Sequence, residues 1–256
     1  MKHSALAGEL HEARLARTTV PTLTSRMPDL TREDAYSIQV AGIDHRRAEG
    51  ETLVGGKLGF TSPAMQRAMG VDSPNYGWLT DAMLVHDRVV RLSDLIHPKV
   101  EPEIAFLLAD DLGADATAEQ VHAATAAVAP CLEVVDSRFH EFRFLAFDNI
   151  ADNSSAGRVI MGDAAGATRI DLRKVGVVVS VDGEVMHTAA GAAALNDPAE
   201  AVAWMARTVA GRRRNLRAGD IVISGGLTAP VDLHAGMTVR VDIDRIGSAS
   251  LRATED

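Results

Sequence analysis

The sequence predicts an α+β fold, in which a smaller helical N-terminal region, residues 1–50, precedes a mixed, β-rich body, residues 51–256. Two segments with helical periodicity come first, and short β-like runs dominate from about residue 52 onward. These runs do not alternate regularly with helices as they do in βαβ proteins, and the sequence has no internal repeat. With 256 residues, of which 46% are hydrophobic, the chain can bury a sizeable core.

Helices are expected where apolar residues recur three or four positions apart. That spacing occurs over residues 4–17 and again over residues 31–50, where a threonine stands at the N-cap position and a glycine at the end. In the body, Thr117 followed by a glutamine three residues later predicts a helix that ends at Pro130. Asp197, followed by a proline and then an acid, predicts the start of another helix.

Strands are expected in short runs of β-branched and apolar residues. Asp182-Gly183 predicts a hairpin between two of these runs, and the last run alternates strictly between apolar and polar residues. The expected strands cover residues 52–54, 88–91, 100–108, 131–136, 175–181, 185–188, 220–224 and 237–243.

Charge and hydropathy argue against several classes of function. A net charge of −9 and a pI of about 5.5 disfavour a nucleic-acid partner, which requires a basic surface. No apolar stretch of the sequence approaches the ~20 residues of a membrane span, and the acid-containing N-terminus is unlike a signal peptide. Cys131 is the single cysteine, so an internal disulfide is excluded. We therefore expect a cytoplasmic protein with no nucleic-acid and no membrane partner.

The run KVEPEIAF places two carboxylates, Glu101 and Glu103, on one face of an expected strand. Neighbouring carboxylates on a partly buried face raise each other's pKa, and a divalent cation between them removes that cost. Glu133, in the strand-like run CLEVVDSRF, is a third candidate ligand. The alternative is a solvated sheet face on which the glutamates pair with basic residues such as Lys99 and Arg138. Spacing alone leaves both interpretations open.

Two glycine-rich segments and one polar segment are further candidates for a site. In GGKLGFTS, glycines surround Lys57, which either lies in a surface turn or meets a carboxylate or a developing oxyanion. SGGLTAP, residues 224–230, is a second glycine-rich segment that either turns or approaches a ligand. In DNIADNSS, residues 148–155, the polar side chains either cap turns or line a polar pocket.

Taken in order, these segments resemble the hydratase/decarboxylase family of aromatic meta-cleavage pathways, within the fumarylacetoacetate hydrolase superfamily. The similarity extends from about residue 28 to about residue 252. The E-x-E pair, the later E-V-x-D-x-R and the A-D-N-x-S segment are specific as a set rather than singly. The resemblance implies a fold of the fumarylacetoacetate hydrolase type. It rests on GGKLGFTS, GVDSPNYGWL, HPKVEPEIAF, LEVVDSRF, IADNSS and ISGGLTAPVDLHAGMTVRVDIDRIGSAS.

The resemblance also implies roles for the candidate residues. It implies that a Mg²⁺ or Mn²⁺ ion is held by Glu101, Glu103 and Glu133. It further implies a small 2-oxo acid substrate, a homo-oligomer and, for decarboxylase members, a partner hydratase. The implied catalytic residues are Lys57, Asp152 and Ser155, and the implied substrate-binding residues are Asn75, Arg138, Asn153 and Ser154.

Two lyase reactions share such a site in the family, decarboxylation of 2-oxo-3-hexenedioate and hydration of 2-hydroxypenta-2,4-dienoate. Both use the metal as a Lewis acid on the keto oxygen, and hydration also needs a base that positions water. Hydratase members often carry an aspartate where this sequence has Asn75, and an amide is not a base. The resemblance therefore favours the decarboxylase, whose pocket should be mainly apolar at its far end with at most one positioning cation, Arg138. The hydratase is the alternative.

Two further hypotheses come from other classes of protein. The chain could be a metal-dependent C–C hydrolase of the wider superfamily, which needs its own base to activate water. It could also be a non-catalytic subunit that binds a catalytic partner. A subunit of that kind should have lost a metal ligand or Lys57, and this sequence keeps all four residues.

Overall fold

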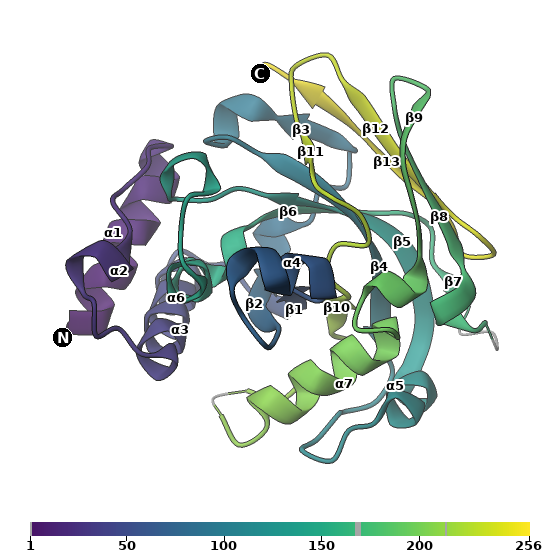
Figure 1. Ribbon diagram of the computed structural model, residues 1–256, viewed down its shortest axis with the longest axis horizontal. Coiled ribbons are helices and arrows are strands. Elements are labelled where there is room, and N and C mark those ends of the chain that lie inside the picture. Colours follow the sequence, from purple (N-terminus) through teal and green to yellow (C-terminus); the bar gives the residue numbers. More distant parts are fainter. Residues whose placement is uncertain (1, 167–169, 213) are drawn as a thin grey trace.

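Two β-sheets form the body of the protein, as the computed structural model shows (Figure 1). The structure describes residues 2–166, 170–212 and 214–256. The 8-stranded sheet follows the order β2-β1-β10-β4-β5-β6, with β11 beside β4 and β7 beside β5, and the 5-stranded sheet follows the order β3-β13-β12-β8-β9. The strands are β1 (Leu53–Gly59), β2 (Asn75–Thr80), β3 (Val89–Arg91), β4 (Lys99–Leu108), β5 (Thr125–Val135), β6 (Ala156–Met161), β7 (Ala165–Gly166), β8 (Gly176–Val181), β9 (Glu184–Ala190), β10 (Ile221–Ile223), β11 (Val231–Asp232), β12 (Thr238–Ile243) and β13 (Gly247–Thr254).

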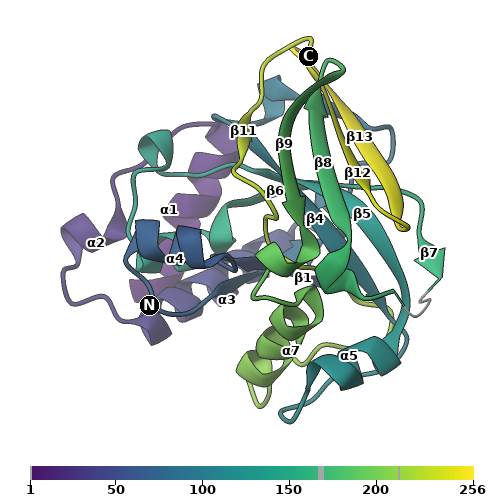
Figure 2. The same cartoon turned by 45° about the vertical axis from the view of Figure 1, so that its right-hand side comes forward.

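Most helices gather in two groups. The first group contains α1, α3 and α6, and the second contains α5 and α7, which pack together at another side of the molecule (Figures 1 and 2). None of the described helices has the length and apolar character needed to cross a membrane. The helices are α1 (Lys2–Ala16), α2 (Leu23–Arg26), α3 (Arg32–Ala48), α4 (Pro63–Met69), α5 (Ala118–Ala124), α6 (Ala146–Ala151) and α7 (Pro198–Val209), with short 3₁₀ turns at Asp81–Met83, Leu92–Asp94, His140–Phe142, Asn153–Ser155, Leu172–Lys174 and Gly191–Ala193.

The antiparallel pair β4 and β5 lies in the middle of the larger sheet. Its register runs from Lys99 opposite Val135 to Leu108 opposite Thr125. Strands β12 and β13 of the smaller sheet pack against β5, which therefore lies between the two sheets. The larger of two hydrophobic clusters among the described residues joins side chains of α1 and α3 to those of the strands. The division of the chain into residues 1–50 and 51–256 stays a prediction.

The expected β-rich α+β architecture is confirmed, but the expected helix that ends at Pro130 is wrong. The capping box at Thr117 is present and starts α5, yet the helix ends at Ala124 and β5 continues through Pro130. Upstream of this proline, β5 pairs with β7 as far as Val128, and downstream it pairs with β6 from Cys131 onward. Pro130 therefore lies between two ladders, where its missing N–H removes no hydrogen bond to either strand.

Several strands differ from the expected runs. β1 extends the expected run 52–54 through Lys57 to Gly59, so this lysine lies in a strand rather than in a surface turn. The strands β2, β6 and β13 were not expected. Every residue of β2 is buried, and a strand buried on both faces lacks the alternation that identifies a half-buried strand. The hairpin at Asp182-Gly183 joins β8 to β9, as expected.

Candidate metal centre and substrate pocket

The pairing of β4 with β5 brings together Glu101, Glu103 and Glu133, which we call the glutamate cluster. Glu101 lies directly opposite Glu133 in the register of the two strands. Glu103 lies two residues further along β4 on the same face, because side chains alternate along a strand. One carboxylate oxygen of each residue lies within 4.8 Å of the others. Three oxygen donors therefore face one common space.

The glutamate cluster is deeply buried and incompletely hydrogen-bonded. Glu103 and Glu133 have exposed fractions of 0%. Oε2 of Glu103 accepts a 2.7 Å hydrogen bond from the Gly225 N–H. Oε1 of Glu103 and Oε1 of Glu133 have no hydrogen-bond partner among the described residues. Burial raises the pKa of all three carboxyls, that of Glu101 to about 7, so ionising the cluster is unfavourable unless a cation is present.

Lys57 is the base that faces the glutamate cluster. It lies on β1, which β10 separates from β4 in the larger sheet. Its ammonium lies 2.9 Å from Oε2 of Glu133 and donates a 2.9 Å hydrogen bond to the backbone carbonyl of Ser154. Burial by itself would lower the pKa of Lys57, but the charges of Glu133 and the other two glutamates raise it above its ordinary value. Lys57 therefore remains a buried ammonium.

A hard divalent cation fits this set of donors. Three ionised carboxylates and one ammonium leave two negative charges, which a divalent ion neutralises. Carboxylate oxygens suit Mg²⁺, Mn²⁺ and Ca²⁺, whereas soft metals prefer thiolates. Burial, aided by Glu103 and Glu133, raises the pKa of the neighbouring Cys131 thiol well above its ordinary value.

Two glycines allow the chain to approach these groups closely. A β-carbon at Gly226 would lie 3.0 Å from the carboxylate of Glu101. A β-carbon at Gly59 would lie 2.2 Å from the side-chain oxygen of Asn75. The two glycine-rich segments thus pack directly against side chains of the candidate site; their approach to a ligand stays a prediction.

A chain of buried polar side chains lies beside Lys57. Ser154 donates a 3.0 Å hydrogen bond to Asn75, the Asn75 amide donates one of 2.7 Å to Asn149, and the Asn149 amide donates one of 3.0 Å to Ser155. The backbone of Ser154 and Ser155 has left-handed φ angles of 53° and 56°. Strained backbone of this kind concentrates at functional sites. The structure thus brings Asn75, Ser154 and Ser155 close to Lys57.

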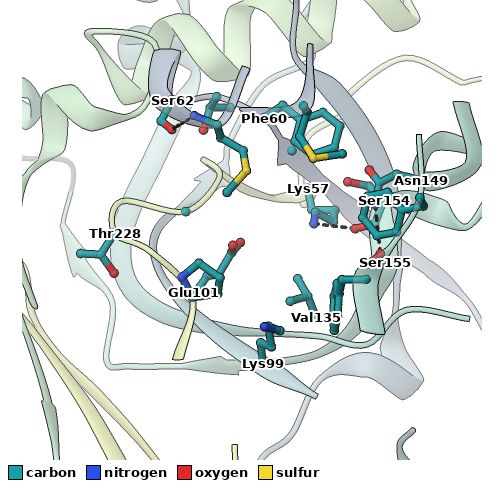
Figure 3. Close-up of a pocket in the computed structure, with 18 residues that line it drawn as sticks. Lys57, Phe60, Ser62, Lys99, Glu101, Val135, Asn149, Ser154, Ser155 and Thr228 are labelled. Carbon is teal, nitrogen blue, oxygen red and sulfur yellow. Dashed lines mark hydrogen bonds between the residues drawn. The ribbon is translucent and has the colours of Figure 1, made fainter. Parts of the chain in front are cut away.

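A cavity of about 200 Å³ lies beside these groups (Figure 3). The carboxylate of Glu101 and the ammonium of Lys57 face it, with Ser154 and Ser155 beside the lysine. Among the described lining residues, Glu101 carries the only carboxylate and Lys57 and Lys99 carry the only cations. Much of the remaining wall is apolar. The lining residues are Lys57, Gly59, Phe60, Thr61, Ser62, Met65, Met69, Lys99, Glu101, Val135, Phe142, Phe144, Asn149, Ser154, Ser155, Gly226, Thr228 and Pro230.

Arg138, Asp152 and Asn153 lie away from this cavity and line a different, smaller one beside α1 and α3. Arg138 forms a buried ion pair with the Asp152 carboxylate and donates a 2.8 Å hydrogen bond to its backbone carbonyl. The expectation that Arg138 is the cation of the substrate pocket is therefore corrected, because Asp152 already holds its guanidinium. The Asn153 side chain accepts a 2.8 Å hydrogen bond from the backbone N–H of Trp78 and donates one of 2.9 Å to its carbonyl.

Sequence reasoning missed several residues of the cavity wall. Lys99 was expected only as a partner of the glutamates, although its position two residues before Glu101 is a signal that both share one strand face. Phe142 and Phe144 lie in the segment after β5, and no local sequence pattern indicates that they line the cavity. The hydroxyl of Thr61 is buried without a hydrogen-bond partner among the described residues, and this residue also lines the cavity.

The two-sheet fold, with acidic side chains on a central strand pair and a buried lysine facing them, matches the class of protein that the sequence motifs indicated. The chain belongs to the fumarylacetoacetate hydrolase family. The family model described as "Fumarylacetoacetate (FAA) hydrolase C-terminal" matches residues 61–253.

Its relatives include two kinds of lyase. A 2-hydroxypent-2,4-dienoate hydratase of Pseudomonas putida is 44% identical over 208 residues, which cover 80% of this chain and 94% of that protein. A 4-oxalocrotonate decarboxylase of Pseudomonas sp. (strain CF600) is 41% identical over 251 residues, which cover 97% of this chain and 95% of that protein. The structure of 4-oxalocrotonate decarboxylase from Pseudomonas putida G7, complexed with magnesium and adipate, has a TM-score of 0.95 at 38% identity and covers 98% of this chain and 97% of its own. Identity alone does not separate the two activities.

Proposed function

We propose that this protein is a divalent-metal-dependent decarboxylase that converts 2-oxo-3-hexenedioate (4-oxalocrotonate) to 2-hydroxypenta-2,4-dienoate and carbon dioxide in aromatic meta-cleavage catabolism. The composition of the cavity wall carries the proposal. The described lining residues include no histidine and, apart from Glu101, no carboxylate. Hydration needs a base that positions water, whereas decarboxylation needs an electron sink and a wall that does not hold the departing carboxylate tightly.

The glutamate cluster would hold the metal, Mg²⁺ or Mn²⁺. The two carboxylate oxygens without partners, on Glu103 and Glu133, support this assignment, as does the magnesium in the related decarboxylase structure. When bound, the cation would supply a Lewis acid for the keto oxygen of the 2-oxo acid.

The side chains of this protein would do the rest of the chemistry. The bond to the carboxylate at the far end of the substrate would break, and its electron pair would move through the conjugated double bond toward the keto oxygen as carbon dioxide leaves. That oxygen would then take up a proton from solvent to give 2-hydroxypenta-2,4-dienoate. Lys57, buried and kept protonated by the glutamates, would stabilise the negative charge that develops there. Ser155 and Asn149 line the same cavity and would orient the substrate. The apolar wall excludes the water that hydration would consume.

Asp152 and Arg138 would act indirectly. Their ion pair anchors the segment Asn153–Ser155, whose Ser154 carbonyl accepts the hydrogen bond from Lys57. Asp152 is thus a positioning residue in this proposal rather than the catalytic group expected from the resemblance. Asn153 and Asn75 would hold the same segment, through Trp78 and Ser154 respectively.

Hydration of 2-hydroxypenta-2,4-dienoate is the second candidate function, and the 44% identity to a hydratase favours it. The decarboxylation product is the substrate of such a hydratase, so the proposal includes a partner hydratase. It also keeps the cytoplasmic homo-oligomer that was expected from the sequence and the resemblance.

Steady-state assays with Mg²⁺ test the proposed decarboxylase activity directly. Carbon dioxide should be released from 2-oxo-3-hexenedioate, and 2-hydroxypenta-2,4-dienoate should gain little water. Efficient hydration of the dienoate with no carbon dioxide from the diacid would overturn the decarboxylase in favour of the hydratase.

A further inference from the structure

Lys99 borders the cavity and lies on the same strand as Glu101 and Glu103 of the glutamate cluster. It is the first residue of β4, two positions before Glu101, so the two side chains share one face of the strand. In the sheet it lies opposite Val135 on β5 and opposite Asp232 on β11. Figure 3 shows Lys99 next to Val135 at the edge of the cavity, with Glu101 above it in that view.

The ammonium of Lys99 is held loosely, in contrast to that of Lys57. Its Nζ lies 3.0 Å from Oδ1 of Asp232 and 5.3 Å from the centre of the Phe142 ring. The side chain of Lys99 is 31% exposed and that of Asp232 is 66% exposed, so water screens this ion pair. Lys57 is only 3% exposed and is held by Glu133 and the Ser154 carbonyl. Of the two cations, Lys99 is the one that can change partners at little cost.

The spacing along β4 suits a linear diacid of about six carbons. Neighbours on one face of a strand are about 6–7 Å apart, because each residue advances the strand by about 3.3 Å. A 2-oxo acid whose oxo end lies at the glutamate cluster would therefore extend its far end toward Lys99. The wall between these positions includes Val135 and Phe142, which suit a hydrocarbon chain.

We propose that Lys99 is the specificity-determining residue that recognises the terminal carboxylate of a dicarboxylic 2-oxo acid, and that it exchanges Asp232 for the substrate. The proposal rests on the proposed function for the orientation of the substrate. Because Asp232 competes for the ammonium, Lys99 binds the carboxylate weakly enough for it to leave as neutral carbon dioxide. Lys99 then returns to Asp232.

Two inert ligands that differ only at the far end test this role. 2-Oxoadipate has a terminal carboxylate, and 2-oxohexanoate has a methyl group in its place. Calorimetric titration of the Mg²⁺-loaded protein should show that 2-oxoadipate binds about tenfold more tightly, which is the value of one charge-assisted hydrogen bond to a partly exposed cation. Lys99→Met should abolish that preference while leaving the affinity for 2-oxohexanoate unchanged.

Lys174→Met is the matched control. Lys174 pairs with Asp171 at 3.2 Å, is 76% exposed, and is not among the cavity-lining residues, so its loss removes the same charge and the same kind of ion pair. This variant should keep the preference for 2-oxoadipate. Asp232→Asn should increase the preference, because it removes the competitor for the ammonium. An unchanged ligand ratio in Lys99→Met, or equal weakening of both ligands, would overturn the proposal, since the latter would place Lys99 at the oxo end.

The ligand titrations and the carbon dioxide assay together separate this proposal from the proposed function. A Lys99-dependent preference for 2-oxoadipate without release of carbon dioxide from 2-oxo-3-hexenedioate would refute the decarboxylase and leave the carboxylate-recognition role intact. Carbon dioxide release from 2-oxo-3-hexenedioate, together with a ligand ratio that is the same in the wild type and in Lys99→Met, would support the decarboxylase and refute the role of Lys99 in carboxylate recognition.

Discussion

Beside the small cavity near α1 and α3, the buried bases Arg138 and Arg46 each pair with an acid of their own, whereas beside Lys57 three acids share one base. We call the first group the balanced cluster. Its charges cancel pair by pair, but the glutamate cluster with Lys57 keeps two negative charges when all groups are ionised. The pairs of the balanced cluster are Arg138–Asp152 and Arg46–Glu51.

The difference separates two uses of buried charge. A balanced ion pair satisfies itself, so its loss is felt mainly in stability. An unbalanced group with unpartnered oxygens is unfavourable until a ligand completes it, so its loss is felt mainly in binding and catalysis. Both clusters contain residues that the sequence marked as candidates, but only the glutamate cluster has the charge imbalance of a cation site.

Replacing one acid of the glutamate cluster should have the largest effect on activity. Glu133→Gln keeps the shape of the side chain but removes a charged ligand. The loss of several kcal/mol of Lewis-acid stabilisation should lower the turnover rate by about 10³-fold or more. Circular dichroism should show an intact fold. Glu119→Gln, on the exposed side of α5, is the matched control and should retain wild-type turnover.

Thermal unfolding measures how much bound Mg²⁺ stabilises the wild type and the Glu133→Gln variant. Mg²⁺ at about 100 times its Kd should raise the free energy of unfolding of the wild type by about 2.7 kcal/mol, because it binds only the folded state. Glu133→Gln should lose most of this stabilisation. Full turnover by EDTA-treated protein without added metal would contradict the assignment of the site.

Breaking the balanced cluster should instead reduce stability. Arg138→Met leaves the buried Asp152 carboxylate without its cation, which should lower the free energy of unfolding by about 3–5 kcal/mol. Urea denaturation measures this loss. Arg173→Met removes an exposed arginine–aspartate pair that water screens, and should leave the free energy of unfolding nearly unchanged. If the two variants were equally stable, or if Arg138→Met abolished Mg²⁺ binding in folded protein, the distinction between the clusters would be wrong.

Lys57→Met removes the buried ammonium that pairs with Glu133 and should separate catalysis from metal binding. Losing a buried donor to a developing oxyanion typically costs about 10²–10³-fold in rate. The affinity for Mg²⁺ should not fall, because the cluster becomes more negative. Lys174→Met again serves as the control with wild-type rate. A Lys57→Met variant that turns over within about threefold of the wild type would remove Lys57 from the chemistry.

Local patterns in the sequence predicted part of the site because the period of a strand is fixed. The spacing of Glu101 and Glu103 places them on one face wherever β4 lies in the fold. The partnership with Glu133 depends on the register between β4 and β5, which local sequence does not determine, and it came from the resemblance instead. The N-cap threonine of α3 and the hairpin between β8 and β9 are local features and were predicted for the same reason.

The errors have long-range causes. Arg138 and Lys99 are both cations near the acidic motifs. The spacing of Lys99 and Glu101 places them on one strand face, but no local pattern shows that Arg138 is held away from the cavity. The ion pair with Asp152 holds Arg138 away from the cavity, and this contact joins segments that meet only in the folded chain. The helix expected up to Pro130 fails similarly, because the pairing of β5 with β4, β6 and β7 overrides the helical start.

The smallest expected effect concerns Asn75, whose replacement by aspartate adds a second unbalanced carboxylate. Asn75 is 2% exposed, is hydrogen-bonded to Ser154 and Asn149, and is not one of the described residues that line the cavity. Burial should raise the pKa of a new carboxyl there, because the nearby Lys57 ammonium is already paired with Glu133; the group should then be largely protonated at neutral pH and a poor base. Asn75→Asp should therefore raise hydration of 2-hydroxypenta-2,4-dienoate by no more than a few-fold, an order-of-magnitude expectation for a misplaced base.

Asn149→Asp is the matched variant, because Asn149 belongs to the same hydrogen-bonded chain but does line the cavity. Its carboxylate would meet the substrate directly and should promote hydration more than Asn75→Asp does. Absorbance of the dienoate follows water addition in both variants, with carbon dioxide release measured in parallel. A gain of about a hundredfold in Asn75→Asp, comparable to the contribution of a well-placed general base, would mean that a single amide separates decarboxylase from hydratase at this site. A small gain in Asn75→Asp alongside a larger one in Asn149→Asp would show that access to the cavity, rather than the presence of an acid nearby, decides which reaction the glutamate cluster supports.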